Sequence, residues 1–339
     1  MRAYQIRQSG KKFHFLLMGL FALNGVTTAQ TTGIVRPDSV ILNVDFENHK
    51  NGERYGICDV KKDFGTMLSL GTFWPWRRVR IDSVAEFDHV LQVYYPRKKL
   101  RSFASGASWK FSDFQPRQEA FLSYWVFFPD SFEFRAGGKL HGLVGGKGNT
   151  GGKKPNGHDG WSCRVHWGDG DLIKLYVYHK DQAREWGDTF FFTHHPPVIN
   201  IRNADTVKRF PEREIHVSRG RWHHVQIRVK VNASGYRNGL AQAWFDGELV
   251  ADVQGFEFRS SDVEADKLLI NAFYFSTFFG GRGEHYQPVK DETVLFDRFV
   301  MSKTLYRPKE MAYNQTEEQT GHLCSVNGVS EKSLIAGPE

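Results

Sequence analysis

Cysteine is scarce in this chain, and long apolar runs are scarcer still. The 339 residues include three cysteines, Cys58, Cys163 and Cys324, whose spacing matches no zinc-binding motif. We expect Cys163 to be a buried, inert thiol, and a disulfide between Cys58 and Cys324 stays an open alternative. The most apolar run, residues 15–23, is shorter than the roughly 20 residues of a membrane-spanning helix. The sequence therefore argues against an integral membrane protein.

The apolar run has the flanks of a secretory signal. Four basic residues precede it, and the small residues at 27–29 offer a cleavage site. We therefore predict that residues 1–29 are a signal peptide and that the mature protein is secreted or periplasmic.

The remainder lacks a Pro- or Ser-rich linker, an internal repeat and sustained helical periodicity. We predict one domain over residues 30–312 and a polar C-terminal tail over residues 313–339. Short β-type runs bounded by Gly, Asp, Asn and Pro favour an all-β, concanavalin-like jelly roll of two antiparallel sheets with a concave cleft. These runs are residues 39–47, 89–96, 119–129, 162–168, 174–180, 221–232, 239–253, 267–281 and 292–302.

Excess charge is small overall but concentrated in one segment. Removal of the four basic residues of the signal lowers the formal net charge from +7 to +3. Between Lys139 and Arg184, however, eight basic residues stand against four acidic ones. This local excess predicts an anionic ligand near the segment.

The segment contains a hairpin, "SCRVHWGDGDLIKLYVYHK", over residues 162–180. Two alternating runs flank a Gly-Asp-Gly turn, and successive side chains in a strand point to opposite faces. The apolar positions suit the core. The opposite, polar face is then predicted to carry Ser162, Arg164 and His166 from the first strand and Lys174, Tyr176, Tyr178 and Lys180 from the second.

Upstream, "FEFRAGGKLHGLVGGKGNTGG" (residues 132–152) places Lys139 and His141 two positions apart, which predicts the same polar face for both. The Gly-rich stretch that follows, with Lys147, lacks the spacing and the Lys-Ser/Thr ending of a phosphate-binding P-loop. We interpret it as a flexible lid at the mouth of a groove.

The predicted polar face combines tyrosines with Arg and Lys and has no pair of carboxylates. Such a set indicates a site that removes a proton from a uronic acid. Cations stabilise the charge that builds on the uronate carboxylate when the C5 proton leaves, and they favour the phenolate form of a nearby tyrosine. In mannuronate and glucuronate one tyrosine can remove the C5 proton and protonate the C4 oxygen, because both lie on the same side of the ring. A glycoside hydrolase ranks last, since no strand carries a carboxylate pair on the polar face.

Four segments, "GGKLHGLVGGKGNTGG", "WSCRVHW", "LYVYHKDQ" and "FYFSTFFGG", resemble the family 14 polysaccharide lyases and, more distantly, the glucuronan lyases. The resemblance covers most of residues 40–305 and implies an alginate lyase-like jelly roll. The family's Lys, Ser-x-Arg and Tyr-x-Tyr positions match Lys139, Ser162, Arg164, Tyr176 and Tyr178. His141 replaces the proline that usually follows Lys-Leu in the family.

These observations assign roles. Lys139 and Arg164 are predicted to hold the carboxylate. One of Tyr176 and Tyr178 transfers the proton, and Tyr178 is preferred because Lys180 is close to it in sequence. The predicted substrate-binding residues are Ser162, His141, His166, Lys180, Lys174 and Lys147.

The predicted partner is an anionic polysaccharide, with no nucleic acid, membrane, metal or cofactor, and the chain is expected to be a monomer. A non-catalytic carbohydrate-binding jelly roll stays the alternative. The identity of the uronate polymer and the choice between internal and terminal cleavage are both open.

Overall fold

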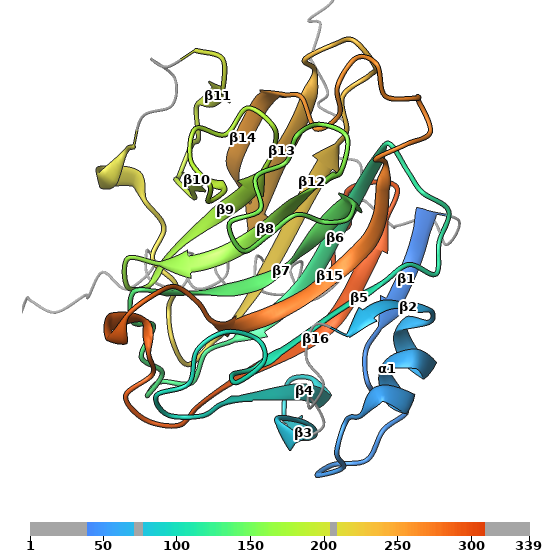
Figure 1. The fold of residues 1–339 in the computed structure, drawn as a ribbon. Helices are drawn as coiled ribbons and strands as arrows, with labels where there is room; N and C mark the ends of the chain where they lie inside the picture. Colours follow the sequence, from blue (N-terminus) through green and yellow to red (C-terminus); the bar gives the residue numbers. More distant parts are fainter. Residues whose placement is uncertain (1–38, 71–76, 204–208, 309–339) are drawn as a thin grey trace, which may run out of the picture. The chain divides into compact units, whose positions relative to one another are not determined.

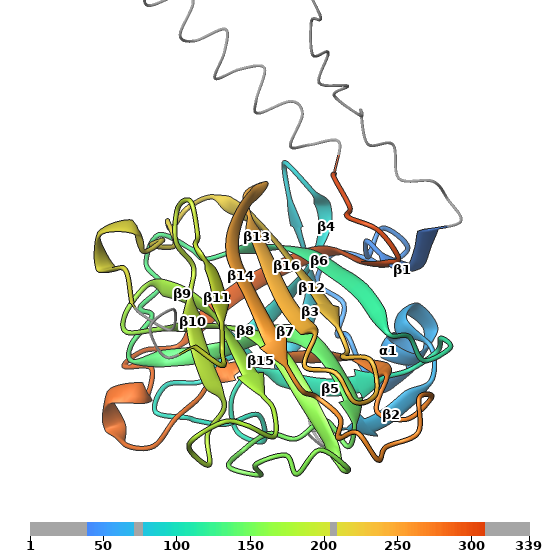
Figure 2. The same cartoon turned by 90° about the horizontal axis from the view of Figure 1, so that it is seen from above.

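The structure is a computed structural model that describes residues 39–70, 77–203 and 209–308. The predicted signal and tail, and Cys324 with them, lie outside these ranges. The described residues form two sheets that enclose one apolar core, and this confirms the predicted all-β jelly roll (Figures 1 and 2). No helix in the described part of the chain is long and apolar enough to cross a membrane.

Each sheet is built mainly from antiparallel neighbours. Among the described residues the larger sheet has nine strands, in the order β11 (Val198–Asn200), β14 (Glu248–Phe256), β13 (Gly239–Phe245), β12 (Trp222–Lys230), β6 (Glu119–Phe127), β16 (Glu292–Ser302), β4 (Asp88–Tyr95) and β3 (Val79–Val84), with β1 (Val40–Val44) paired to β16. The smaller sheet has seven, in the order β10 (Asp188–Phe191), β9 (Leu172–Tyr178), β8 (Gly160–Gly168), β7 (Gly137–Gly146), β15 (Ile270–Phe279), β5 (Ala107–Phe111) and β2 (Met67–Leu70). The predicted run 239–253 is thus a hairpin of two strands and not one.

Aromatic side chains fill the space between the sheets. Trp109 of β5 stacks on Phe275 of β15 with ring centroids 3.8 Å apart, and Phe273 of β15 lies 5.7 Å from Phe299 of β16 in the other sheet. The helix α1 (Ile57–Phe64) lies beside β1 and β2 (Figure 1), and its Phe64 packs 4.8 Å from Phe111. Burial of such large rings accounts for much of the stability of a sandwich core.

The hairpin of β8 and β9 has the predicted register. Three residues, Asp169 to Asp171, connect the two strands, and Asp169 and Gly170 both have positive φ, 54° and 85°, a conformation that Gly adopts freely and Asp tolerates. This turn pairs Ser162 with Tyr178, Arg164 with Tyr176 and His166 with Lys174. The predicted polar face of the hairpin therefore exists, up to the end of β9 at Tyr178.

The predicted placement of His141 on this face is wrong. The pairing of β7 with β8 shifts between Lys139 and Gly142, which is a β-bulge, and a bulge breaks the alternation of side chains. The imidazole of His141 therefore points into the core, where its ring lies 4.1 Å from that of Phe275. The ring also lies 4.6 Å from Phe296 and 5.1 Å from Phe299 of the larger sheet, so His141 is between the two sheets and not on the face that a substrate could reach. Burial also lowers the pKa of His141 well below its usual value, which keeps the ring neutral.

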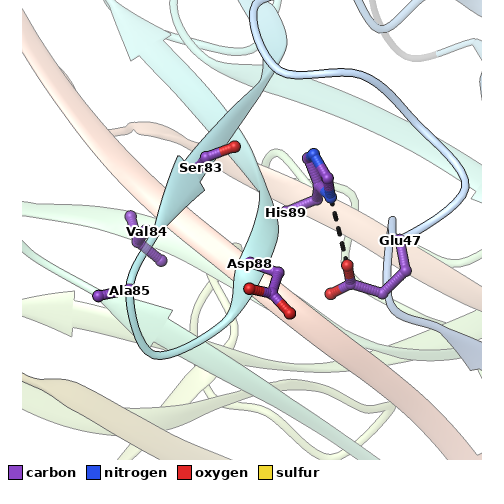
Figure 3. A pocket seen from close by; sticks show the side chains of 6 residues that line it. All are labelled: Glu47, Ser83, Val84, Ala85, Asp88 and His89. Atoms are coloured by element: carbon purple, nitrogen blue, oxygen red, sulfur yellow. Dashed lines mark hydrogen bonds and ion pairs between the residues drawn. The ribbon is translucent and has the colours of Figure 1, made fainter.

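A hollow lies near the turn between β3 and β4. Figure 3 shows its lining residues, where His89 of β4 hydrogen-bonds Glu47 at 3.2 Å. All of them belong to β3, β4, the turn between them or the segment after β1, so the hollow contains none of the predicted site residues. On the neighbouring β16, Asp297 is fully buried, and burial raises its pKa to about 9.

Asp297→Asn is expected to stabilise the protein, and to do so more at higher pH. An aspartate has an ordinary pKa near 4, so between about pH 4 and about pH 9 the folded state holds a proton that the unfolded state has released. Wild-type stability therefore falls as pH rises through this window. The gain in the free energy of unfolding should reach the order of a few kcal/mol near pH 8 and shrink toward pH 5.

Thermal unfolding of wild type and variant across this pH range measures the effect. Asp266→Asn is the matched control, because Asp266 is exposed. A gain that did not change with pH would contradict the buried, protonated state of Asp297.

Candidate active site

The polar face of the smaller sheet gathers side chains from five adjacent strands. The central positions of β9, β8, β7, β15 and β5 are paired with one another in register. In this order they are Tyr176, Arg164, Gly142, Tyr274 and Lys110. The structure thus brings together the predicted hairpin residues and two residues, Tyr274 and Lys110, that the sequence argument missed.

The two tyrosines of β9 share a hydrogen bond. Their hydroxyl oxygens lie 3.3 Å apart, and the backbone N–H of Gly152 donates to the oxygen of Tyr178 at 3.0 Å. Tyr178 is fully buried and Tyr176 is 8% exposed. Burial, reinforced by the hydrogen bond to Tyr178, raises the pKa of Tyr176, so the neighbouring cations do not make it a phenolate.

Arg164 occupies the centre of the face. Gly142 has no side chain and lies between Arg164 and Tyr274; an added Cβ there would be 2.6 Å from the Arg164 Cα. The guanidinium therefore crosses β7, donates to Ser276 Oγ of β15 at 3.2 Å, and lies 5.1 Å from the Tyr274 ring and 5.8 Å from the Tyr176 ring.

No acid among the described residues neutralises the charge of Arg164. The residue is 2% exposed, its Nε has no hydrogen-bond partner, and no described carboxylate lies within 4 Å of it. A buried guanidinium without a counterion is costly, and an anionic ligand would relieve that cost.

Lys139 and His166 stand at one end of the face. The Lys139 Nζ lies 3.1 Å from His166 Nδ1 and 5.0 Å from the centroid of the Tyr176 ring, on which His166 also packs at 3.9 Å. Burial, together with the charges of Arg164 and Lys174, lowers the pKa of Lys139 well below its usual value. Burial and the same cations also lower the pKa of His166 well below its usual value. Its ring is therefore neutral, and its Nδ1 can accept a hydrogen bond from the Lys139 ammonium.

The Gly-rich segment after β7 lies against the other end. Ser162 donates its hydroxyl to the carbonyl of Asn149 at 2.7 Å, and Gly152 bonds Tyr178 as described above. The Lys147 side chain is exposed, and the carbonyl of Lys147 accepts a hydrogen bond from the Lys110 ammonium at 2.9 Å. The predicted lid segment therefore covers Ser162 and Tyr178 in this structure.

Two predicted lysines are already paired with acids. Lys174 lies 3.4 Å from Asp169, and Lys180 lies 2.6 Å from Glu257. Strand β9 ends at Tyr178, so Lys180 is outside the alternating run that the sequence argument assumed. Its paired charge no longer supports the sequence-based reason for preferring Tyr178 over Tyr176.

Tyr274 is the missed residue with the most distinctive setting. Its ring lies between the Arg164 guanidinium and the Lys110 ammonium, and Ser108 donates to its hydroxyl at 3.5 Å. Burial alone would raise its pKa, but the two cations and the serine hydroxyls outweigh burial and lower it. Alternation in "FYFST" and "SWK" could have indicated these positions, but residues 107–111 were not predicted to be a strand.

The described residues contain no group of three His, Cys, Asp or Glu side chains that could hold a metal ion. The cations of this face, instead, are the groups that could hold an anion. Together with the tyrosine hydroxyls they make up a site that could bind a carboxylate and move a proton beside it.

Comparison with known proteins places the chain in a family. The model of polysaccharide lyase 14 matches residues 84–299, more than half of the chain. A protein described as Exolysin, from Paramecium bursaria Chlorella virus 1, is 26% identical over 200 residues, which are 54% of this chain and 29% of that protein. The chain thus spans well under half the length of this relative.

Solved structures agree with the assignment. The alginate lyase Aly36B is 25% identical with a TM-score of 0.62, and the match covers 79% of this chain and 98% of that one. A variant of Aly36B was solved in complex with an alginate trisaccharide. It is 26% identical with a TM-score of 0.62, and the match covers 78% of this chain and 98% of that one. The PL-14 alginate lyase from Aplysia kurodai is 18% identical with a TM-score of 0.60, and the match covers 78% of this chain and 98% of that one. The predicted family is confirmed: this chain belongs to polysaccharide lyase family 14.

Proposed function

We propose that this protein is a polysaccharide lyase that cleaves a uronic-acid polymer, of the alginate or glucuronan type, by β-elimination. The observation that carries the proposal is Arg164, a buried cation with no described counterion, beside two hydrogen-bonded tyrosines. A uronate carboxylate supplies the missing negative charge and brings its C5 proton close to the tyrosines. The alginate trisaccharide bound by the Aly36B variant supports a substrate of this class.

In the proposed reaction Arg164 and Lys139 hold the carboxylate. Lys139 uses one N–H on His166 and keeps two for a ligand, since an ammonium has three donors. A bound carboxylate favours the charged form of Lys139 against the burial that lowers its pKa, so both cations stabilise the enolate-like transition state that forms as the C5–H bond breaks. Ser162 is bonded to the covering segment, so we assign it a positioning role.

Tyr178 is the proposed base and acid. Its oxygen is hydrogen-bonded to both the Gly152 N–H and the Tyr176 hydroxyl, so two neighbouring groups hold it in position. The phenolate takes the C5 proton, the electron pair forms the C4–C5 double bond, and the C4–O bond breaks. Tyr178 then returns the proton to the departing C4 oxygen. Because Tyr178 is fully buried, the segment around Gly152 has to move before a polymer can reach it.

A panel of polymannuronate, polyguluronate and glucuronan tests the proposal. Cleavage by elimination creates an unsaturated uronate that absorbs in the ultraviolet, and sizing of the products separates internal from terminal cutting. Binding of a polymer without any unsaturated product would instead support the non-catalytic carbohydrate-binding alternative.

We also propose that the protein works outside the cytoplasm as a monomer. The argument for export is the signal-like residues 1–29, and the anionic polymer itself is an extracellular material. Mass spectrometry of the exported protein, which should lack these residues, and its size in solution check both points.

A further inference from the structure

A second cation, Lys110, faces the site from β5, and the described residues supply no counterion for it. The Lys110 ammonium donates to the carbonyls of Lys147 and Gly148 at 2.9 and 3.2 Å, and no described carboxylate lies within 4 Å of it. Two of its three N–H donors are thus in use, and the third is free for a ligand. Lys110 is half-buried, so its charge is only partly screened by water.

The surroundings of Lys110 mirror those of Lys139. The Lys139 ammonium lies 5.0 Å from the Tyr176 ring, and the Lys110 ammonium lies 4.9 Å from the Tyr274 ring. Arg164 stands between the two tyrosines and is within 6 Å of both rings. Cations and phenols therefore alternate in a row that runs across the strands, from β9 to β5.

A uronate polymer carries one carboxylate on every sugar, so it is a ligand with a matching row of negative charges. We propose that Lys110 and Tyr274 form a second uronate subsite, which holds the carboxylate of a sugar near the reacting one, and that the polymer lies across the strands of the smaller sheet. This inference rests on the proposed function, since it extends the same site.

Lys110 also holds the covering segment through two carbonyls, and the test has to separate that role from carboxylate binding. Lys110→Gln removes the charge but keeps an amide N–H that can bond a carbonyl. Lys110→Arg keeps the charge. Lys267→Gln is the matched control, because Lys267 is an exposed lysine that lies near the surface acids Glu264 and Asp266.

The experiment measures kcat/KM on defined uronate oligomers, from the shortest that is cleaved to the hexamer, and calorimetric affinity for the same oligomers. For wild type both quantities should rise at the length that first fills the second subsite. Lys110→Gln should remove that step, with about 10-fold loss on long oligomers and little change on the shortest. Lys110→Arg should restore most of the loss, and Lys267→Gln should behave as wild type.

Two results would overturn the subsite. An equal loss at every length would mean that Lys110 acts only through the covering segment, and no loss at any length would mean that it binds no carboxylate. If wild type cleaves none of the oligomers, the proposed function fails separately. The length dependence of affinity in wild type and Lys110→Gln then decides the subsite by itself.

Discussion

Arg164→Ala should lower kcat/KM on a uronate polymer by about 100-fold or more, the scale of losing a donor that stabilises charge in the transition state. The guanidinium is buried, lacks a described counterion and lies beside Tyr176 and Tyr274 at once. Its removal takes away the charge that makes the C5 proton acidic. The loss should appear in kcat as well as in KM, because the charge on the carboxylate grows as the reaction proceeds.

Arg164→Lys should rescue little of this loss. The guanidinium reaches Ser276 on β15 by crossing Gly142, and a single ammonium cannot reproduce its planar set of donors. Arg228→Ala is the matched control, since Arg228 lies on the other sheet and is paired with Glu119. Thermal unfolding of each variant shows whether the fold survives. A loss of only a few-fold in a folded Arg164→Ala protein would rule out carboxylate stabilisation by Arg164.

Tyr178→Phe should abolish elimination, with a loss at the upper end of the roughly 100- to 10,000-fold range that general acid-base groups contribute. The change removes one oxygen and keeps the ring, so the packing of β9 should survive. Affinity for the polymer should also be kept, because the cations of the site are untouched. Tyr176→Phe removes only the hydroxyl that is hydrogen-bonded to the Tyr178 oxygen, and we expect a smaller loss, on the order of 10-fold.

Initial rates of unsaturated-product formation, circular dichroism and polymer affinity should be compared for both single variants and the double variant. Tyr236→Phe is the control, because Tyr236 is 66% exposed on the surface. Near wild-type turnover in the double variant would exclude the tyrosine mechanism. Inactivity of Tyr176→Phe with an active Tyr178→Phe would transfer the proton-moving role to Tyr176.

The sequence predicted the β8–β9 half of the site well, because a short turn determines the register of the strands that it joins. From the turn at Asp169 and Gly170 it follows that Arg164 faces Tyr176 and Ser162 faces Tyr178. Local alternation was enough here, since nothing interrupts it between the turn and Tyr178.

The other half depends on features that local alternation does not show. The bulge after Lys139 sends His141 into the core, and the end of β9 leaves Lys180 to pair with Glu257. Tyr274 and Lys110 reach the site only because strands far apart in sequence become neighbours in the sheet. Such pairings depend on the whole fold, so no single segment predicts them.

Gly142 makes the two halves of the site electrically dependent on each other. Because no side chain separates Arg164 from Tyr274, one guanidinium serves the tyrosines of both β9 and β15. An anion bound on the Tyr176 side partly cancels the field that a second anion would meet on the Tyr274 side. Thermodynamic linkage makes this penalty reciprocal, so each bound anion lowers the binding affinity of the other by the same factor. In the proposed two-subsite arrangement, two sugars that share this guanidinium are therefore held less tightly together than their separate affinities would give.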